Sequence, residues 1–460
     1  MLKPTIYSLG NDILNAQLLR NATAIAVESL SWMELEGLSE RLALVKTTQQ
    51  LGIRHPRSMR MAFLFIVETT RALNLVDRIA RSVMPEEQLE DLDLGVKNFL
   101  RVFIWWTILH GSGVNDASDL LEAGRHVLGW RELKDLEFVF GKVLTFDRTR
   151  FMRAIPDPEQ TALSTFNRTW FVSYCYRTFG RGFALDLLKG TLSTPPTYIR
   201  INAPRNNEQL IDEIERERVK IRPVERLDGL FQVVRTERPL TLTKSYQLGY
   251  FSIQDKSSYL AAIVADPKKN DMILDLCAAP GGKTSHIAVL TENSATICSV
   301  DISHRRMGVW KREMQRCKIL SAVPIIADGR SLPIKQTFDL VFVDPPCTNS
   351  GAYGKTPSLK WRLTPNSLTR LAQIQWGIIN TAVQVVKPGG HLIYSTCSVT
   401  LEENELQIER LLKINPQYKL EEELPFIGHE GLRGLNKCQR LYPNLDNCNG
   451  YFISSLKREY

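Results

Sequence analysis

The sequence predicts an α/β protein in which a helical N-terminal part precedes a doubly wound, mainly parallel sheet. Two patterns carry this prediction. From Ile13 to about Phe146, apolar residues recur every three or four positions, as amphipathic helices require. From Met272 onward, short β-rich runs alternate with helical stretches. A repeated order of strand and then helix is typical of a parallel sheet with helices on both faces.

Residues 1–146 are expected to form an all-helical domain. Turn-forming glycines and prolines fall where a helical bundle needs its turns, at 52–56, at Pro85 and at 111–113. The aromatic residues between 99 and 106 are expected to pack its core. The chain has 460 residues, enough for about three domains at roughly 150 residues each.

Residues 147–270 are expected to form a linking α+β module. Basic and aromatic residues are mixed over 148–177, and the pair Pro195-Pro196 precedes an extended segment at Tyr198–Asn202. The basic residues fit a track along a nucleic acid. They equally fit the solvated sides of helices whose aromatic residues face inward, and the charge pattern alone favours this second interpretation.

Residues 271–460 are expected to hold the sheet. Five candidate strands and a closing strand are expected at 272–276, 296–300, 324–327, 338–343, 391–395 and 451–456. In such a sheet the ligand lies outside the carboxyl ends of the strands, near the point where the strand order reverses. The residues that directly follow each strand are therefore the candidates for function.

The composition describes a globular protein with a modest positive charge. Hydrophobic residues make up 43% and charged residues 23%, which excludes disordered and low-complexity classes. Lys plus Arg exceed Asp plus Glu by 58 − 50 = 8, which mildly favours a polyanionic partner, although the same surplus fits a role in solubility equally well. The apolar stretches fall short of the roughly 20 residues that span a bilayer, and Met1–Thr5 does not begin a signal peptide. We therefore expect no membrane association and a cytoplasmic location.

The cysteines indicate neither a disulfide framework nor a zinc site, because none of the eight form a CxxC pair. No metal is expected, and a reducing compartment fits. Each cysteine is then either a core residue or a nucleophile. They are Cys175, Cys277, Cys298, Cys317, Cys347, Cys397, Cys438 and Cys448.

A loop of small residues follows the first candidate strand and precedes a helical stretch. It consists of Cys277, Ala278, Ala279, Pro280, Gly281, Gly282 and Lys283. Small residues let the backbone approach a ligand at the N-terminus of a helix. A phosphate-binding loop would require glycine at position 277, and the dinucleotide pattern GxGxxG is absent.

Acidic residues end three successive candidate strands: Asp301, Asp328 and Asp344. Each alone is typical of a strand-end loop. Together they indicate a site for a nucleoside-type cofactor, with Asp301 placed to accept hydrogen bonds from a ribose diol.

Two cysteines also follow neighbouring strands. Cys347 lies in the segment Asp-Pro-Pro-Cys that begins at Asp344, and Cys397 follows the next strand. A lone buried cysteine is usually a small hydrophobic residue, but two beside an acid favour chemistry. A thiolate activates an electron-poor ring by addition, and an acid can supply a proton or hydrogen bond to a ring nitrogen. Lys283 either lowers a cysteine pKa or hydrogen-bonds nearby carbonyls.

With these motifs, the chain from about Thr197 to its C-terminus resembles the RNA (cytosine-5) methyltransferases of the Nop/Sun family. The matching stretches are Tyr198–Asn202, Gln254–Ser258, Cys277–Lys283, Asp344–Gly351, Thr396–Ser398, Glu402–Asn404, Arg440–Pro443 and Gly450–Phe452. The helix pattern before Gly113 is similar to the NusB-like RNA-binding domain of bacterial 16S ribosomal RNA cytosine-5 methyltransferases.

The resemblance implies a Rossmann-like sheet, S-adenosylmethionine as cofactor, and RNA as substrate. It implies that Cys397 is the nucleophile that adds to carbon 6 of cytosine, that Cys347 assists release, and that Asp344 also faces the base. Ribosomal RNA is the expected substrate, with transfer RNA as the rival. No obligate protein partner is evident. The implied cofactor residues are Cys277, Ala278, Ala279, Pro280, Gly281, Gly282, Lys283, Asp301, Asp328 and Asp344.

Two functions of other classes compete with this interpretation. A non-catalytic RNA-binding assembly factor would not need both thiols and the acids, and all are present. A DNA cytosine methyltransferase is expected to place its nucleophile in the Pro-Cys loop alone. Because Cys397 is present in addition to Cys347, an RNA enzyme is favoured.

Overall fold

The computed structural model describes residues 16–203, 208–332, 336–422 and 424–460. The expected helix start at Ile13 and the N-terminal segment Met1–Thr5 lie outside these residues. The chain forms two compact units. The first comprises Met1–Ser193 and Thr356–Trp361, and the second comprises Thr194–Lys355 and Arg362–Tyr460.

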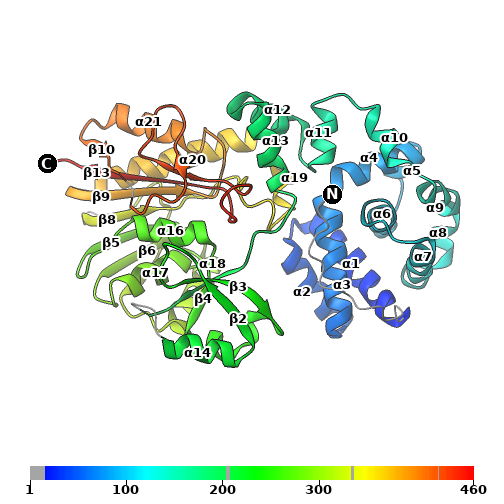
Figure 1. The fold of residues 1–460 in the computed structure, drawn as a ribbon, viewed down its shortest axis with the longest axis horizontal. Coiled ribbons are helices and arrows are strands. Elements are labelled where there is room, and N and C mark those ends of the chain that lie inside the picture. The colour runs from blue at the N-terminus through cyan, green and yellow to red at the C-terminus, as the bar shows by residue number, and fades with distance from the viewer. Residues whose placement is uncertain (1–15, 204–207, 333–335, 423) are drawn as a thin grey trace. The chain divides into compact units, whose positions relative to one another are not determined.

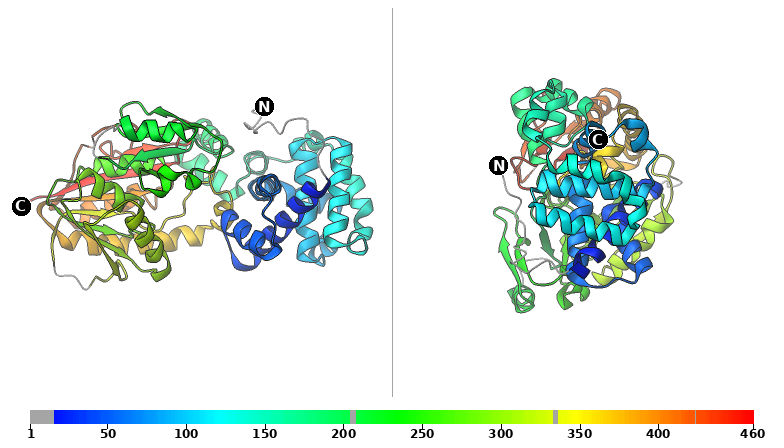
Figure 2. Two further views of the ribbon diagram at one scale, coloured as in Figure 1. Left: turned by 90° about the horizontal axis from the view of Figure 1, so that it is seen from below. Right: turned by 90° about the vertical axis from the view of Figure 1, so that its right-hand side faces the viewer.

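The first unit is helical, as expected (Figure 2). Its elements are α1 (Ala16–Glu36), α2 (Glu40–Leu51), α3 (Pro56–Arg71), α4 (Leu73–Val83), α5 (Glu86–Glu90), α6 (Leu94–Ile104), the π-helical turn η1 (Trp105–His110), α7 (Val114–Leu128), α8 (Trp130–Leu133), η2 (Lys134–Leu136), α9 (Glu137–Leu144), α10 (Arg148–Arg153), α11 (Glu159–Ser164), α12 (Thr169–Phe179) and α13 (Arg181–Gly190). Helix α1 packs against α2, α3, α6 and α7. The expected aromatic residues Phe99, Phe103, Trp105 and Trp106 are all buried.

Glycine and proline end and begin these helices where the sequence predicts turns. Gly52 follows α2 with a φ of +67°, a left-handed conformation that glycine adopts without strain. Pro56 then occupies the first position of α3, where its missing N–H has no helical partner to lose.

The segment 147–270, expected as one linking module, is divided between the two units. Helices α10 to α13 belong to the first unit. Phe171 and Tyr174 of α12 are buried, so these two aromatic residues of the basic stretch face inward. Most of the remainder forms a separate antiparallel sheet, whose first strand follows the prolines at 195–196.

The four strands of this small sheet are ordered β2-β3-β1-β4. The elements are β1 (Tyr198–Ile201), α14 (Glu208–Arg216), β2 (Val219–Pro223), β3 (Leu230–Thr236), η3 (Leu240–Leu242), α15 (Lys244–Gln247) and β4 (Phe251–Ile253).

A short segment from the second half of the chain, Thr356–Trp361, is part of the helical unit. The Ser358 N–H donates to Glu40 Oε1 at 2.8 Å, and Trp361 Nε1 donates to the Thr70 carbonyl at 2.6 Å. The chain that follows the Cys347 loop is thereby anchored on α2 and α3.

The large sheet has nine strands, ordered β11-β12-β13-β9-β8-β5-β6-β7, with β10 paired to β13. They are β5 (Met272–Leu276), β6 (Thr296–Asp301), β7 (Ala322–Ile326), β8 (Phe338–Val343), β9 (Val386–Thr396), β10 (Tyr418–Leu420), β11 (His429–Glu430), β12 (Gln439–Leu441) and β13 (Tyr451–Arg458). The five strands β7, β6, β5, β8 and β9 are parallel, and β13 closes the sheet antiparallel to β9. The predicted doubly wound fold is confirmed, and its strand order reverses between β5 and β8.

Helices cover both faces of this sheet (Figure 1). Those that pack on it are α16 (Lys256–Val264), α17 (Gly282–Leu290), α18 (His304–Arg316), α20 (Pro365–Val385) and α21 (Glu405–Ile414); α19 (Leu359–Arg362) begins in the anchored segment. Ile273 packs with residues of α16, α17 and α18, whereas its neighbour Leu274 packs with residues of α20 and α21. A strand buried on both faces reads as a continuous apolar run, which is why β5 and β8 are recognisable in the sequence.

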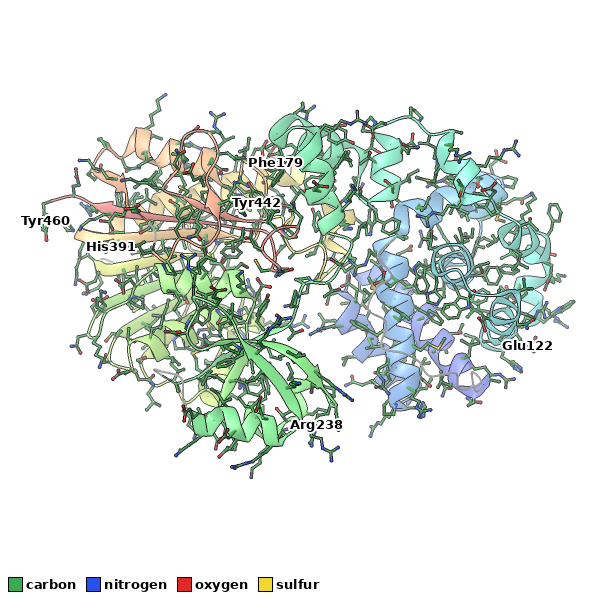
Figure 3. The ribbon with its side chains drawn as sticks, in the orientation of Figure 1. Glu122, Phe179, Arg238, His391, Tyr442 and Tyr460 are labelled. Carbon is green, nitrogen blue, oxygen red and sulfur yellow. The ribbon has the colours of Figure 1, made fainter. Side chains whose placement is uncertain are left out.

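Tyr442 follows β12 near the end of the sheet where β9 ends, and His391 lies in β9 toward the other end (Figure 3).

Among the described residues, no helix is both long and apolar enough to cross a membrane.

Candidate active site

The point where the strand order reverses carries an ion pair. Lys283, in the first turn of α17, follows β5, and Asp344 follows β8. Lys283 Nζ lies 2.6 Å from Asp344 Oδ2, and both side chains are largely withdrawn from solvent. Burial acts to lower the pKa of Lys283, but the adjacent Asp344 carboxylate and Tyr451 raise it above its ordinary value. Lys283 is therefore a fixed cation whose partner is a carboxylate rather than a carbonyl.

The loop between β5 and α17 is shaped by tight backbone turns. Gly281 has a φ of +107°, and a Cβ there would lie 2.8 Å from Met314 Cε and 3.0 Å from Trp310 Cδ1. A Cβ on the next residue, Gly282, would meet no atom within 4 Å. The N-terminus of α17 thus faces open space on the Gly282 side, where a ligand can approach the backbone.

Asp301 is the last residue of β6 and is buried. Its Oδ2 accepts a hydrogen bond from the Ala279 N–H at 3.3 Å, and its Oδ1 accepts one from the Ser303 N–H at 2.9 Å. Arg306 Nη1 lies 3.3 Å from Oδ2. The structure therefore brings Asp301 against the Cys277–Lys283 loop, as expected.

Asp328 takes a different partner from the other two acids. Its carboxylate accepts hydrogen bonds from the Arg330 N–H at 2.9 Å and from Arg330 Nη2 at 2.6 Å. These bonds hold the pKa of Asp328 below its ordinary value. Asp301 and Asp344 contact residues of the Cys277–Lys283 loop, whereas the Asp328 carboxylate is paired with Arg330.

Asp275, inside β5, is a buried acid that the sequence does not single out for a role. Thr284 Oγ1 donates to its Oδ2 at 2.5 Å, and Trp310 Nε1 donates to Thr284 Oγ1 at 3.1 Å. Burial raises the pKa of Asp275 to about 7, with the Asp344 and Asp301 carboxylates acting in the same direction. The group therefore titrates near neutral pH.

The two conspicuous thiols meet at the ends of β8 and β9. Cys347 Sγ lies 3.2 Å from Cys397 Sγ. Asn349 holds both loops, since its Oδ1 accepts from the Cys397 thiol at 2.9 Å and its Nδ2 donates to the Cys347 carbonyl at 2.9 Å. The Gly351 N–H donates to the Cys397 carbonyl at 3.0 Å. The structure thus places the thiols side by side, as their sequence positions predict.

Cys347 and Cys277 both have raised pKa values. The hydrogen bond with Cys397 and burial raise the pKa of Cys347 well above its ordinary value, and Glu403 contributes in the same direction. Burial also raises the pKa of Cys277, as do Asp344, Asp301 and Asp275. Cys277 and Cys347 are therefore held as neutral thiols, so that Lys283 does not activate Cys277.

Tyr451 joins this group, although sequence reasoning assigned it no role. Its hydroxyl donates toward Asp344 Oδ1 at 3.2 Å and lies 3.1 Å from Ser395 Oγ. Ser395 Oγ itself donates to Asp344 Oδ1 at 3.3 Å. Asp344 is consequently fixed on both oxygens. The available signal was the position of Tyr451 at the start of the closing strand, beside the end of β9.

Arg200 of β1 is another residue whose role the sequence did not reveal. It is fully buried, and it donates from Nη1 to the Gly282 carbonyl at 3.1 Å and from Nη2 to Ser285 Oγ at 3.0 Å. The small sheet thereby fixes the first turn of α17. The segment Tyr198–Asn202 belongs to a matching stretch, but its contact with α17 depends on the tertiary fold.

Comparison with known families identifies this unit. Residues 262–457 match the family described as 16S rRNA methyltransferase RsmB/F. This match spans less than half of the chain, and over those residues the chain is similar to that family. Of the curated relatives, the probable ribosomal RNA small subunit methyltransferase B of Bacillus subtilis is 29% identical over 66% of this chain and 70% of its own length. The tRNA (cytosine(72)-C(5))-methyltransferase of Pyrococcus horikoshii is 36% identical over 48% of this chain, and the match spans 55% of its own length.

Solved structures share the fold of this methyltransferase. The crystal structure of PH0851 has a TM-score of 0.83 and 24% identity, covering 95% of this chain and 99% of that one. NSun6 from Pyrococcus horikoshii with SFG has a TM-score of 0.59 and 25% identity, covering 63% of this chain and 97% of that one.

S-adenosylmethionine is the cofactor of the methyltransferase, and SFG in the NSun6 structure is its analogue. The residues fit such a group. The open side of Gly282 admits a ligand to the N-terminus of α17, and the Asp301 carboxylate is held beside the same loop at Ala279. Among the described residues, no cluster of three or more His, Cys, Asp or Glu side chains is placed to hold a metal ion.

Proposed function

We propose that this methyltransferase transfers a methyl group to carbon 5 of a cytosine in RNA through a covalent adduct with Cys397, and that its substrate is ribosomal RNA. The observation that carries the proposal is the pair of thiols 3.2 Å apart at the ends of β8 and β9. The adjoining Asp344 is fixed by Lys283 at the point where the strand order reverses. A binding protein that performs no chemistry has no need of this arrangement.

Carbon 5 of cytosine is a poor nucleophile until a group adds to carbon 6. In the proposed reaction the Cys397 sulfur bonds to carbon 6, and the thiol proton passes to the ring so that no net charge develops there. The C5–C6 electron pair then becomes available at carbon 5. S-adenosylmethionine supplies an electrophilic methyl group on a sulfonium. Once carbon 5 carries the methyl group, it loses its proton to a base, the bond between sulfur and carbon 6 breaks, and the ring double bond returns.

Cys347 is the residue proposed to assist release. A thiol held neutral beside the Cys397 sulfur can donate a hydrogen bond to that sulfur as it departs from carbon 6. The choice of Cys397 rather than Cys347 as the attacking group is supported by the resemblance of the Thr396–Ser398 loop to the loop that holds the nucleophile in the Nop/Sun family. Asp344, with one oxygen on Lys283 and the other near Tyr451 and Ser395, is proposed to face the base.

The substrate is proposed from the relatives. The matching family and the Bacillus subtilis relative are named for ribosomal RNA, whereas the Pyrococcus horikoshii relative is named for transfer RNA. We propose that the helical part, residues 1–146, binds RNA, and that Cys277–Lys283, Asp301, Asp328 and Asp344 bind the cofactor. A cytoplasmic place of action is consistent with the free cysteines, which suit a reducing compartment.

Bisulfite sequencing of total RNA from cells with and without the gene tests the proposal. We expect one cytosine in ribosomal RNA to be protected in the first sample and converted in the second. If protection were lost only in transfer RNA, transfer RNA rather than ribosomal RNA would be the substrate. Identical patterns in both samples would contradict the proposed activity.

A further inference from the structure

Glu403 is a buried carboxylate located between the end of β9 and the start of α21. Its side chain is withdrawn from solvent, with a residue exposure of 0%. Burying a carboxylate is costly unless strong hydrogen bonds compensate. The donors are the Thr348 N–H at 2.8 Å, Gln375 Nε2 at 2.9 Å, Thr348 Oγ1 at 2.5 Å, Ser398 Oγ at 2.5 Å and Thr400 Oγ1 at 2.9 Å.

The identity of two donors is informative. Thr348 directly follows Cys347, and Ser398 directly follows Cys397. Consecutive Cα atoms are about 3.8 Å apart across a trans peptide, so a residue fixed in place also fixes the position of its neighbour. One carboxylate therefore holds the residue after each thiol.

The directions of these hydrogen bonds require an acceptor at this position. The Glu403 carboxylate oxygens accept hydrogen bonds from the hydroxyls of Thr348, Ser398 and Thr400. Ser398 Oγ then accepts from the Thr400 N–H at 3.1 Å and pairs with Ser350 Oγ at 2.9 Å. An amide at position 403 would turn an N–H group toward hydroxyls that already donate.

We propose that Glu403 is a positioning residue that fixes the Cys347 and Cys397 thiols relative to each other by holding Thr348 and Ser398. The inference rests on the proposed function, because it assigns the two thiols separate steps. The two hydroxyls also contact each other, with Thr348 Oγ1 3.2 Å from Ser398 Oγ. Loss of the Thr348 hydroxyl should therefore loosen mainly the Cys347 loop, and loss of the Ser398 hydroxyl mainly the Cys397 loop.

The test measures adduct formation and adduct release separately in the full-length protein. A ribosomal RNA transcript containing 5-fluorocytidine reports formation, because fluorine on carbon 5 cannot leave as a proton and the adduct persists on a denaturing gel. Ordinary transcript with labelled S-adenosylmethionine reports release in a single turnover.

We expect Glu403→Gln to slow both steps, by about 100-fold, the effect of displacing a reacting group by roughly 1 Å. Ser398→Ala should slow formation about tenfold, and Thr348→Val should slow release about tenfold, each slowing the other step less. Cofactor affinity should stay unchanged in all three variants, since the Cys277–Lys283 loop lies outside the Glu403 network.

Glu405→Gln is the matched control. Glu405 is equally buried and lies two residues further on, but it pairs with Arg440 Nε at 2.6 Å instead of the residues after the thiols. The Glu405→Gln variant should lose at least as much stability as Glu403→Gln and keep both rates.

Wild-type rates in Glu403→Gln would overturn the inference, as would equal slowing by Glu405→Gln. If Glu403→Gln does not fold, the comparison of Ser398→Ala with Thr348→Val decides. The inference requires the first variant to slow mainly formation and the second mainly release, and equal slowing of both steps by each variant would overturn it. Absence of any wild-type adduct would contradict the proposed function instead.

Discussion

Replacing Lys283 with methionine removes the cation that holds Asp344 while keeping a side chain of similar length. The Oδ2 atom of Asp344 then loses its partner at 2.6 Å. The carboxylate keeps the two longer hydrogen bonds of its Oδ1 atom, from Ser395 at 3.3 Å and Tyr451 at 3.2 Å. Because Asp344 is proposed to face the base, we expect the variant to orient cytosine poorly.

The size of the effect follows from the geometry. The side chains of Lys283 and Asp344 are 14% and 28% exposed, so the pair is shielded from most solvent screening. A hydrogen bond between charged groups contributes about 1.5 to 3 kcal/mol, which corresponds to a fall in kcat/KM of about 10- to 100-fold. Lys283→Arg should lose less, because it keeps the charge.

The chain offers a matched control in a second Lys-Asp pair. Lys387 Nζ lies 2.8 Å from Asp339 Oδ2, but these side chains are 36% and 37% exposed. Exposed pairs contribute about 0 to 1 kcal/mol. Methyl incorporation into RNA should therefore fall strongly in Lys283→Met and little in Lys387→Met. Equal activities in these two variants would refute the reasoning.

Three further predictions concern neighbouring residues. Tyr451→Phe should reduce kcat by about tenfold without changing cofactor affinity, because a hydroxyl near Asp344 is lost; unchanged steady-state kinetics would contradict the role of the phenol. Asp301→Ala should weaken S-adenosylmethionine binding by about 1.5 to 3 kcal/mol in calorimetry, and an unaltered Kd would remove the ribose assignment. Asp275 has a pKa of about 7 when folded, against an ordinary 3.8, so the folded state binds the extra proton and its stability falls as pH rises between these values. The free energy of unfolding of Asp275→Asn, measured in urea, should lack this fall with pH. A dependence on pH equal to that of the wild type would contradict the prediction.

The central strands could be predicted because their chemistry is local. Met272–Leu276 and Phe338–Val343 are mainly apolar, with one aspartate each, and the observed β5 and β8 have the same bounds. β9 begins at Val386, earlier than expected, because Pro388-Gly389-Gly390 reads as a turn although the strand runs through it. The antiparallel strands β10 to β12 have two or three residues each, too few to show a period.

The site was predictable in its loops but less so in its pairings. Strand ends bring Asp344, Cys347 and Cys397 to one edge of the sheet, and the sequence shows where strands end. The partners of these groups are set by tertiary packing. Tyr451 lies 107 positions from Asp344 in the chain. The hydrogen bonds of Glu403 to the Cys347 and Cys397 loops depend on the directions of hydroxyl groups, which no periodic pattern in the sequence predicts.

The central claim is that Cys397 adds to the ring and Cys347 assists release. The most direct test is a denaturing gel of wild type, Cys347→Ala, Cys397→Ala and the double variant after incubation with substrate RNA and S-adenosylmethionine. Cys347→Ala should accumulate a protein-RNA adduct that resists denaturation, whereas Cys397→Ala and the double variant should form none, with cofactor binding preserved in Cys397→Ala. Accumulation in Cys397→Ala would reverse the two roles, and substantial methyl transfer by Cys397→Ala would contradict the claim altogether.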